Sequence, residues 1–173
     1  FSYSPEYPGI SIIEKGYDCT FALAMVRCLF NMTIKASERL DIDAESVAPY
    51  RSALDHLAPD PVDATGLMIS RDVPLSESHR SFSHLVAIYP LGRLTIEGSD
   101  QDRSLINRSI QHLQEIGMGN WAGWSFSWAS LIAARIGRAN MAYAMLRLYK
   151  DFVITDNTFQ LSEDWKRSGI YSS

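Results

Sequence analysis

The stretch SFSWASLIAARIGRANMAYAMLRLYKDF, residues 125–152, holds two helical patterns separated by one glycine. In the first pattern apolar residues occupy almost every side of the predicted helix, which is typical of a helix buried all round. Ser125 is a residue type that caps helix N-termini, and Gly137 breaks the pattern. A second helix, predicted over 139–152, follows at once. The sequence therefore predicts an antiparallel helix hairpin here.

Upstream of this hairpin, apolar residues recur at the three-and-four spacing of an α-helix in four more segments. These segments cover residues 17–40, 43–57, 79–89 and 100–116. Pro59 and Gly117 stand where two of them end. The segment 62–77 is predicted as a loop with one short strand at 67–69. Because no segment alternates as a sheet strand would, the predicted fold class is all-α, built from helix hairpins.

Length and charge narrow the classes of partner. The 173 residues are 46% hydrophobic, enough for one domain with a core, and the formal net charge is -4. With no Lys/Arg cluster there is no electrostatic basis for nucleic-acid binding or for an anionic membrane surface. No apolar run approaches the roughly 20 residues of a membrane span. We therefore expect a neutral partner, and because the sequence begins at Phe1 we expect a piece of a longer protein.

Three motifs carry a family resemblance. HRSFSHL, residues 79–85, followed by IYPL, resembles the His-Arg-His-x-Ser-His-Leu motif of glycoside hydrolase family 95, the alpha-L-fucosidase and alpha-L-galactosidase family. GWSFSW, residues 123–128, is similar to that family's Gly-Trp-Ser helix. YSPEYP, residues 3–8, with the helix that follows it, is similar to the Ser-Pro-Glu loop. The order and spacing agree over residues 3–160.

The resemblance implies an (α/α)6 barrel, six helix hairpins closed into a ring whose loops at one end form the sugar site. Residues 1–173 would supply about half of this ring. It implies a bacterial-type six-hairpin glycosidase that hydrolyses alpha-linked fucose or a related sugar on an oligosaccharide or glycoconjugate glycan, by inversion and without a cofactor. The compartment it suggests is extracellular or periplasmic. Half a ring alone should be inactive, and its uncovered apolar faces should favour self-association.

An inverting glycosidase needs a general acid and a general base on opposite faces of the sugar. The family's acid sits at the start of the helix after the Ser-Pro-Glu loop, and this position corresponds to Asp18. The alternative is that Asp18 only caps that helix, by accepting hydrogen bonds from the amides near Thr20 and Phe21. Glu6, in the preceding loop, is the second candidate carboxyl.

His79, Arg80 and His84 are predicted to bind the sugar, because imidazole and guanidinium groups offer fixed donors that distinguish axial from equatorial hydroxyls. The alternative is that one or both histidines tie the 62–77 loop to the core. The family has a histidine where this chain has Ser81, and this departure bears on which sugar is bound.

Trp124 lies in a glycine-containing loop, where an indole can stack on a sugar face, while Trp128 is predicted to be a core residue. The family commonly has a lysine at the position of Ala129. No set of His, Cys and carboxylate residues has the spacing of metal ligands, so no metal site is predicted. Two alternatives to the enzyme remain open: a catalytically degenerate carbohydrate-binding relative, motivated by Ser81 and Ala129, and an all-α scaffold that binds protein.

Overall fold

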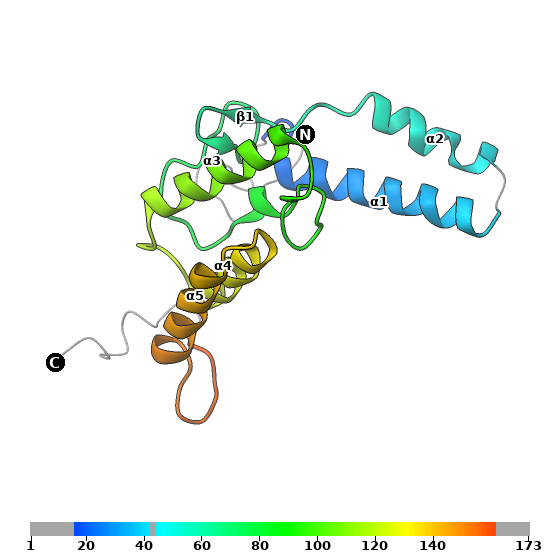
Figure 1. The fold of residues 1–173 in the computed structure, drawn as a ribbon. Helices are drawn as coiled ribbons and strands as arrows, with labels where there is room; N and C mark the ends of the chain where they lie inside the picture. Colours follow the sequence, from blue (N-terminus) through cyan, green and yellow to red (C-terminus); the bar gives the residue numbers. More distant parts are fainter. Residues whose placement is uncertain (1–15, 42–43, 162–173) are drawn as a thin grey trace.

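The computed structural model describes residues 16–41 and 44–161 of the chain. Its helices are α1 (Thr20–Arg39), α2 (Ala44–Asp55), α3 (Asp100–Ile116), α4 (Gly123–Arg135) and α5 (Ala139–Phe152), as Figure 1 shows. A two-stranded ribbon, β1 (Val62–Asp63) and β2 (Gly66–Leu67), and the 3-10 turn η1 (Ser83–Leu85) are the other regular elements in these ranges. The predicted all-α class is confirmed. None of the described helices has both the length and the apolar character that crossing a membrane requires.

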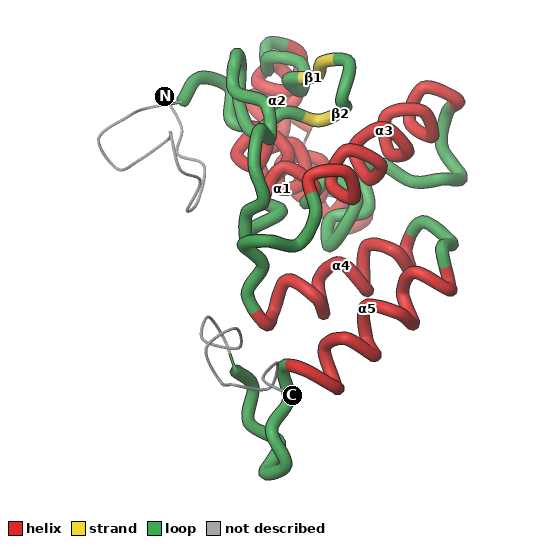
Figure 2. Tube along the Cα trace, turned by 90° about the vertical axis from the view of Figure 1, so that its left-hand side faces the viewer, coloured by secondary structure: helices red, strands yellow, loops and turns green. Residues whose placement is uncertain are grey.

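The predicted hairpin at 125–152 is present, and its two helices, α4 and α5, lie side by side (Figure 2). Gly137 makes the turn with φ 74°, a backbone region that favours glycine. Across the hairpin, the Ser130 hydroxyl donates to the carbonyl of Ala142 at 2.9 Å. The bounds of α5 agree with the prediction. Helix α4 begins two residues earlier than predicted, with Ala122 at the N-cap, so Ser125 as the cap residue was wrong.

Helices α1 and α2 form a second hairpin, which extends away from the rest of the molecule (Figure 1). The rings of Phe30 and Tyr50 pack between the two helices with centroids 5.1 Å apart. Helix α1 begins at Thr20, three residues later than predicted, and buries Leu23, Ala24 and Ile34. Its N-cap residue, Cys19, is fully buried and forms no side-chain cap.

The helix predicted over 79–89 was wrong. Only η1 is helical there, and the chain otherwise runs as turns up to a cis peptide bond between Tyr89 and Pro90. The carbonyl of Ala87 accepts from the amides of Arg93 and Leu94, at 2.8 and 2.9 Å. Because amides beyond the proline donate to this carbonyl, it is not available to the hydrogen bonds of a continuing helix. All side chains from 81 to 88 are buried. The apolar spacing that predicted a helix therefore reflects burial on all sides.

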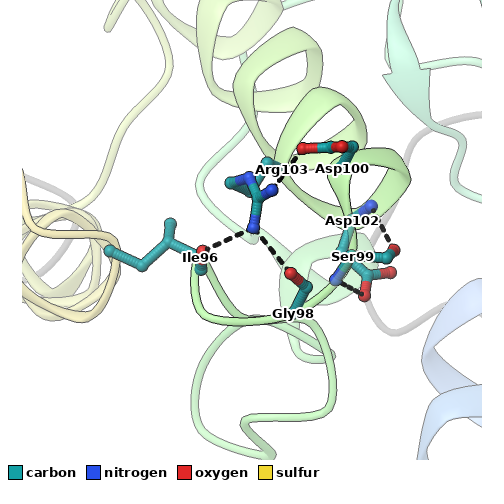
Figure 3. A network of polar contacts seen from close by, with 6 residues as sticks. All are labelled: Ile96, Gly98, Ser99, Asp100, Asp102 and Arg103. Atoms are coloured by element: carbon teal, nitrogen blue, oxygen red, sulfur yellow. Dashed lines mark hydrogen bonds and ion pairs between the residues drawn. The ribbon is translucent and has the colours of Figure 1, made fainter.

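Helix α3 has the predicted bounds, and a capping box explains where it begins (Figure 3). The Ser99 hydroxyl accepts from the amide of Asp102, and the Asp102 carboxylate accepts from the amide of Ser99, both at 3.1 Å. Arg103 braces this turn by donating to the carbonyl of Gly98 at 2.6 Å. With its start fixed, α3 directs Ile106 and Ile110 into the core, where neither is exposed.

The strand predicted at 67–69 is only partly present. Strand β2 ends at Leu67 and pairs antiparallel with β1, Val62 opposite Leu67 and Asp63 opposite Gly66. The ribbon lies against α3, since the amide of Leu67 donates to the Ser109 hydroxyl at 2.9 Å. The ribbon therefore connects the α1–α2 hairpin to α3.

Candidate active site

The two motifs at 79–85 and 123–128 meet in the structure. The buried hydroxyl of Ser125 donates to the carbonyl oxygen of Arg80 at 2.7 Å, across 45 residues of sequence, and accepts from the amide of Ala122 at 3.0 Å. One side chain thus ties the first turn of α4 to the segment that carries His79 and Arg80. The predicted role of Ser125 as a helix cap does not include this long-range contact, which local sequence signals do not reveal.

A second set of hydrogen bonds holds the same segment to the loop before α4. The Ser78 hydroxyl donates to the carbonyl of Gly117 and accepts from the amide of Asn120, both at 2.9 Å. The Asn120 side chain donates to the carbonyl of Ser78 at 3.0 Å. Three bonds therefore fix residue 78, directly before the two predicted sugar-binding residues.

His79 is 8% exposed, and its Nδ1 accepts from the amide of Ser81 at 3.1 Å. The histidine thus shapes its own turn through a backbone group. Arg80 is half-buried beside it. Contact of either residue with a sugar stays a prediction.

His84 lies in the core, 2% exposed, on η1. Burial, together with the neighbouring charges of His112 and His79, lowers the pKa of His84 to about 3, so the ring is neutral at ordinary pH. Its Nδ1 is buried and has no hydrogen-bond partner among the described residues. His112, on α3, bonds to the carbonyl of Leu75 at 2.7 Å. This position gives His84 a part in the core, and its predicted contact with substrate stays a prediction.

Trp124 stands on the first turn of α4 and is half-buried. Its indole stacks on that of Trp128, with centroids 5.8 Å apart and an interplanar angle of 29°. The Trp128 Nε1 donates to the carbonyl of Tyr89 at 3.3 Å, and this bond orients the Trp128 ring. Trp128, predicted to be core, shares this face because it follows Trp124 by one helical turn.

The two indoles open onto a groove of about 580 Å³. Its lining is almost wholly apolar and comes from α1, the 86–90 turns and α4: Phe21, Met25, Val86, Tyr89, Pro90, Trp124, Ser127, Trp128 and Leu131. The Ser127 hydroxyl donates to the carbonyl of Trp124, and Trp128 uses its only donor on Tyr89. The groove thus offers flat apolar faces and few polar groups.

Asp18 precedes α1 and has a φ of 48°. Its carboxylate pairs with the guanidinium of Arg71, whose amide donates to the carbonyl of Tyr17 at 2.9 Å. The amide of Thr20 donates to the carbonyl of Ile69 at 3.0 Å. The alternative role of Asp18, as the cap of this helix, is therefore wrong, because its N-cap is Cys19. A general acid must present its proton to the leaving oxygen, whereas the carboxylate of Asp18 is engaged by Arg71 in the structure.

The structure thus joins the backbone of the segment that carries His79 and Arg80 to the first turn of α4, which carries Trp124, and it pairs Asp18 with Arg71. Neither His79 nor Arg80 lines the groove beside Trp124. Asp18 stands three residues before Phe21, which lines the groove. Glu6 lies outside the described residues. Within 16–41 and 44–161, no group of three or more His, Cys, Asp or Glu side chains is placed to hold a metal ion.

Comparison with known proteins agrees with the motifs. Residues 1–168 match the model of the glycosyl hydrolase family 95 catalytic domain. Over 180 aligned residues the chain is 25% identical to alpha-L-fucosidase 2 of Arabidopsis thaliana; the alignment covers 99% of this chain and 20% of that protein. The chain therefore spans about a fifth of this relative's length. Since the match covers nearly the whole sequence, the chain belongs to the glycosyl hydrolase family 95 catalytic domain.

Proposed function

We propose that this chain forms about half of the (α/α)6 catalytic domain of a glycoside hydrolase that cleaves alpha-linked fucose or a related sugar, by inversion. The hydrogen bond from Ser125 to Arg80 carries the proposal, because it unites the two motifs at one place. The family match and the name of the plant relative support the reaction class and the sugar.

In this proposal Arg80 and His79 donate hydrogen bonds to sugar hydroxyls from the turn that Ser78 and Ser125 hold. Trp124 offers an indole face to the C–H side of the pyranose ring. The core residue His84 stiffens the wall behind them. Ser81 stands where the family motif has a histidine, so one polar contact to the sugar is absent. The sugar that this protein prefers should therefore differ from the family's at the hydroxyl which that histidine would bind.

Asp18 is the proposed general acid and Glu6 the second candidate. Inversion places the acid and the base roughly 6.5–9.5 Å apart, with water between the base and the sugar. Asp18 must leave Arg71 and take up a proton before it can protonate the leaving oxygen. The proposed base lies in another part of the domain, so the 173 residues alone should not turn over substrate.

The test uses the full-length protein and a panel of nitrophenyl glycosides. Alpha-L-fucoside should be cleaved, and proton NMR should show the beta anomer of fucose first. Asp18→Asn should lower kcat by orders of magnitude and leave sugar binding intact, because it removes a transferable proton and little volume. Asp41→Asn is the matched control: Asp41 is also an aspartate with positive φ, 53°, but it is exposed and lies at the far end of α1. It should retain full activity.

A catalytically degenerate carbohydrate-binding protein is the second candidate, and the pairing of Asp18 with Arg71 favours it. In that case the full-length protein binds fucosides, cleaves none of the panel, and Asp18→Asn changes nothing but stability. Loss of activity in Glu6→Gln, with full activity in Asp18→Asn, would transfer the acid role to Glu6.

A further inference from the structure

The return loop, residues 153–161, turns back after α5 (Figure 1) and ends against the first turn of α4. Within it, the amide of Thr155 donates to the carbonyl of Phe159 at 2.9 Å. At its base, the amide of Leu161 donates to the carbonyl of Val153 at 2.8 Å. Val153 is not exposed at all and belongs to the core. The two ends of the return loop are therefore held together on the α4–α5 hairpin.

Gly123, the first residue of α4, makes room for the return loop. A Cβ at this position would stand 2.2 Å from the carbonyl oxygen of Leu161, 2.5 Å from Cγ1 of Val153 and 3.2 Å from Nε2 of Gln160. The first two gaps are far shorter than an ordinary contact of roughly 3.5–4.0 Å. Any larger residue would displace the loop. The glycine of the Gly-Trp-Ser motif thus lets Gln160 come close to the residue before Trp124.

The side chain of Gln160 is exposed but held in one orientation. Tyr149, on α5, donates its hydroxyl to Oε1 of Gln160 at 2.8 Å. Within the described residues this is the one hydrogen bond of the amide, so Nε2 beside Gly123 keeps its two N–H donors for a ligand. A glutamine whose acceptor is bonded to the protein presents a fixed donor.

Three successive residues of α4 place Gln160 across Trp124 from the first motif. At about 100° per residue, Gly123 and Ser125 lie on opposite sides of Trp124 around the helix axis. Ser125 donates to the carbonyl of Arg80, and Gly123 is the residue against which Gln160 lies. We propose that Gln160 is a further sugar-binding residue, whose Nε2 donates to a hydroxyl of the pyranose that stacks on Trp124. The inference rests on the proposed function, in which Trp124 offers its ring to the sugar.

The two sides of the Trp124 ring then differ in chemistry. Arg80 supplies a charged guanidinium, whereas Gln160 supplies a neutral amide donor, which suits the oxygen of a sugar hydroxyl. Tyr149 is a positioning residue, because it fixes this amide and spends its own hydroxyl on it. The ligand is therefore a pyranoside whose ring carries a hydroxyl on the side away from Arg80.

The test measures the affinity of the full-length protein for a thio-linked alpha-L-fucoside, which is not hydrolysed, by isothermal titration. Gln160→Ala should raise the dissociation constant about threefold to tenfold, because one neutral hydrogen bond is lost. Tyr149→Phe should raise it about twofold to threefold, because the amide must then be ordered on binding. Gln111→Ala is the matched control: Gln111 is also exposed and bonds one side chain, Glu115, but it lies on α3. It should leave the affinity unchanged.

Monodeoxy analogues of the same fucoside identify the hydroxyl. For one analogue, the wild type should bind as weakly as Gln160→Ala binds the parent sugar, and the variant should lose no further affinity, since both changes remove the same bond. Unchanged affinity in Gln160→Ala, an equal loss in Gln111→Ala, or additive losses for every analogue would overturn the inference and leave the proposed function standing. A folded wild type that binds no fucoside would overturn both. Circular dichroism confirms that the variants fold.

Discussion

The hydroxyl of Ser125 donates to the carbonyl oxygen of Arg80 at 2.7 Å and so joins two motifs that lie 45 residues apart. Ser125 is not exposed at all, and both of its partners are backbone groups: the carbonyl of Arg80 and the amide of Ala122. Water cannot replace this hydroxyl without entering the core. The geometry of the proposed sugar-binding wall thus depends on one small side chain.

Ser125→Ala should lower the free energy of unfolding by about 1–3 kcal/mol, because it removes the partner of the buried Ala122 amide and of the part-buried Arg80 carbonyl. Ser127→Ala is the control. Its hydroxyl donates only to the carbonyl of Trp124, one turn away, and it is half-buried. This control should change stability by less than about 0.5 kcal/mol. Urea unfolding of both variants measures the difference, and equal values would contradict the importance of the link.

Gly66→Ala should destabilise the junction between the β1–β2 ribbon and α3. A Cβ at this position would stand 2.3 Å from the Ser109 hydroxyl and 2.7 Å from its Cα, and the φ of 121° also disfavours any other residue. We expect a loss of at least about 2 kcal/mol, or roughly 4–8 °C in Tm for a chain of this size. Gly119→Ala, where the nearest atom is 3.9 Å away, should leave Tm unchanged within about 2 °C. Thermal unfolding followed by circular dichroism decides.

His84 should make the chain sensitive to acid. Burial lowers its pKa from 6.5 in the unfolded chain to about 3 in the folded one, so the unfolded state binds the proton first as the pH falls. Its contribution to stability is complete above pH 6.5 and is lost progressively between pH 6.5 and pH 3. At pH 5.5 this costs on the order of 1 kcal/mol relative to pH 7.5.

His84→Leu removes this proton uptake, so its free energy of unfolding should fall less than that of the wild type between pH 7.5 and pH 5.5, by on the order of 1 kcal/mol. His56→Gln, on the exposed end of α2, controls for the loss of an imidazole and should keep the wild-type dependence. Urea titrations at the two pH values give both numbers. Equal pH dependence in the wild type and His84→Leu would show that burial of His84 does not act in this way.

The sequence predicted the bounds of a helix correctly where residues at the end of that helix fix the backbone conformation. The C-terminal ends of α3 and α4 follow from the glycines after them, Gly117 and Gly137, whose positive φ closes a helix. The helix predicted over 79–89 was wrong for the opposite reason. The carbonyl of Ala87 accepts hydrogen bonds from residues beyond Pro90, and the spacing of side chains carries no information about such bonds. Apolar spacing measures which faces are buried, and a turn buried on all sides satisfies it as well as a helix does.

The motifs predicted His79, Arg80 and Trp124 as sugar-binding residues, and this role stays a prediction. The structure adds that Ser125 ties the two motifs together through the Arg80 carbonyl. Two features could not be predicted from the sequence: the pairing of Asp18 with Arg71, 53 residues apart, and the exposure of Trp128 to the groove. Both arise from how the hairpins dock. The four-residue spacing of the two tryptophans was the one local signal that they share a face.

Trp124→Ala in the full-length protein should raise the dissociation constant for a fucoside about threefold to tenfold, because the loss of a stacked aromatic face is worth about 0.5–1.5 kcal/mol. Trp124→Phe keeps a flat ring at the groove and should bind nearly as the wild type does.

Trp128→Phe is the sharper comparison: it retains a ring against Trp124 but removes the donor to the carbonyl of Tyr89, so Trp124 loses its fixed support. If Trp124 binds the sugar directly, its alanine variant weakens binding more than Trp128→Phe does, with kcat changed less than affinity. If the groove only packs against another helix, both variants lower stability and leave the affinity for the sugar unchanged. Isothermal titration with a non-hydrolysable fucoside, run beside urea unfolding of the same variants, separates the two outcomes.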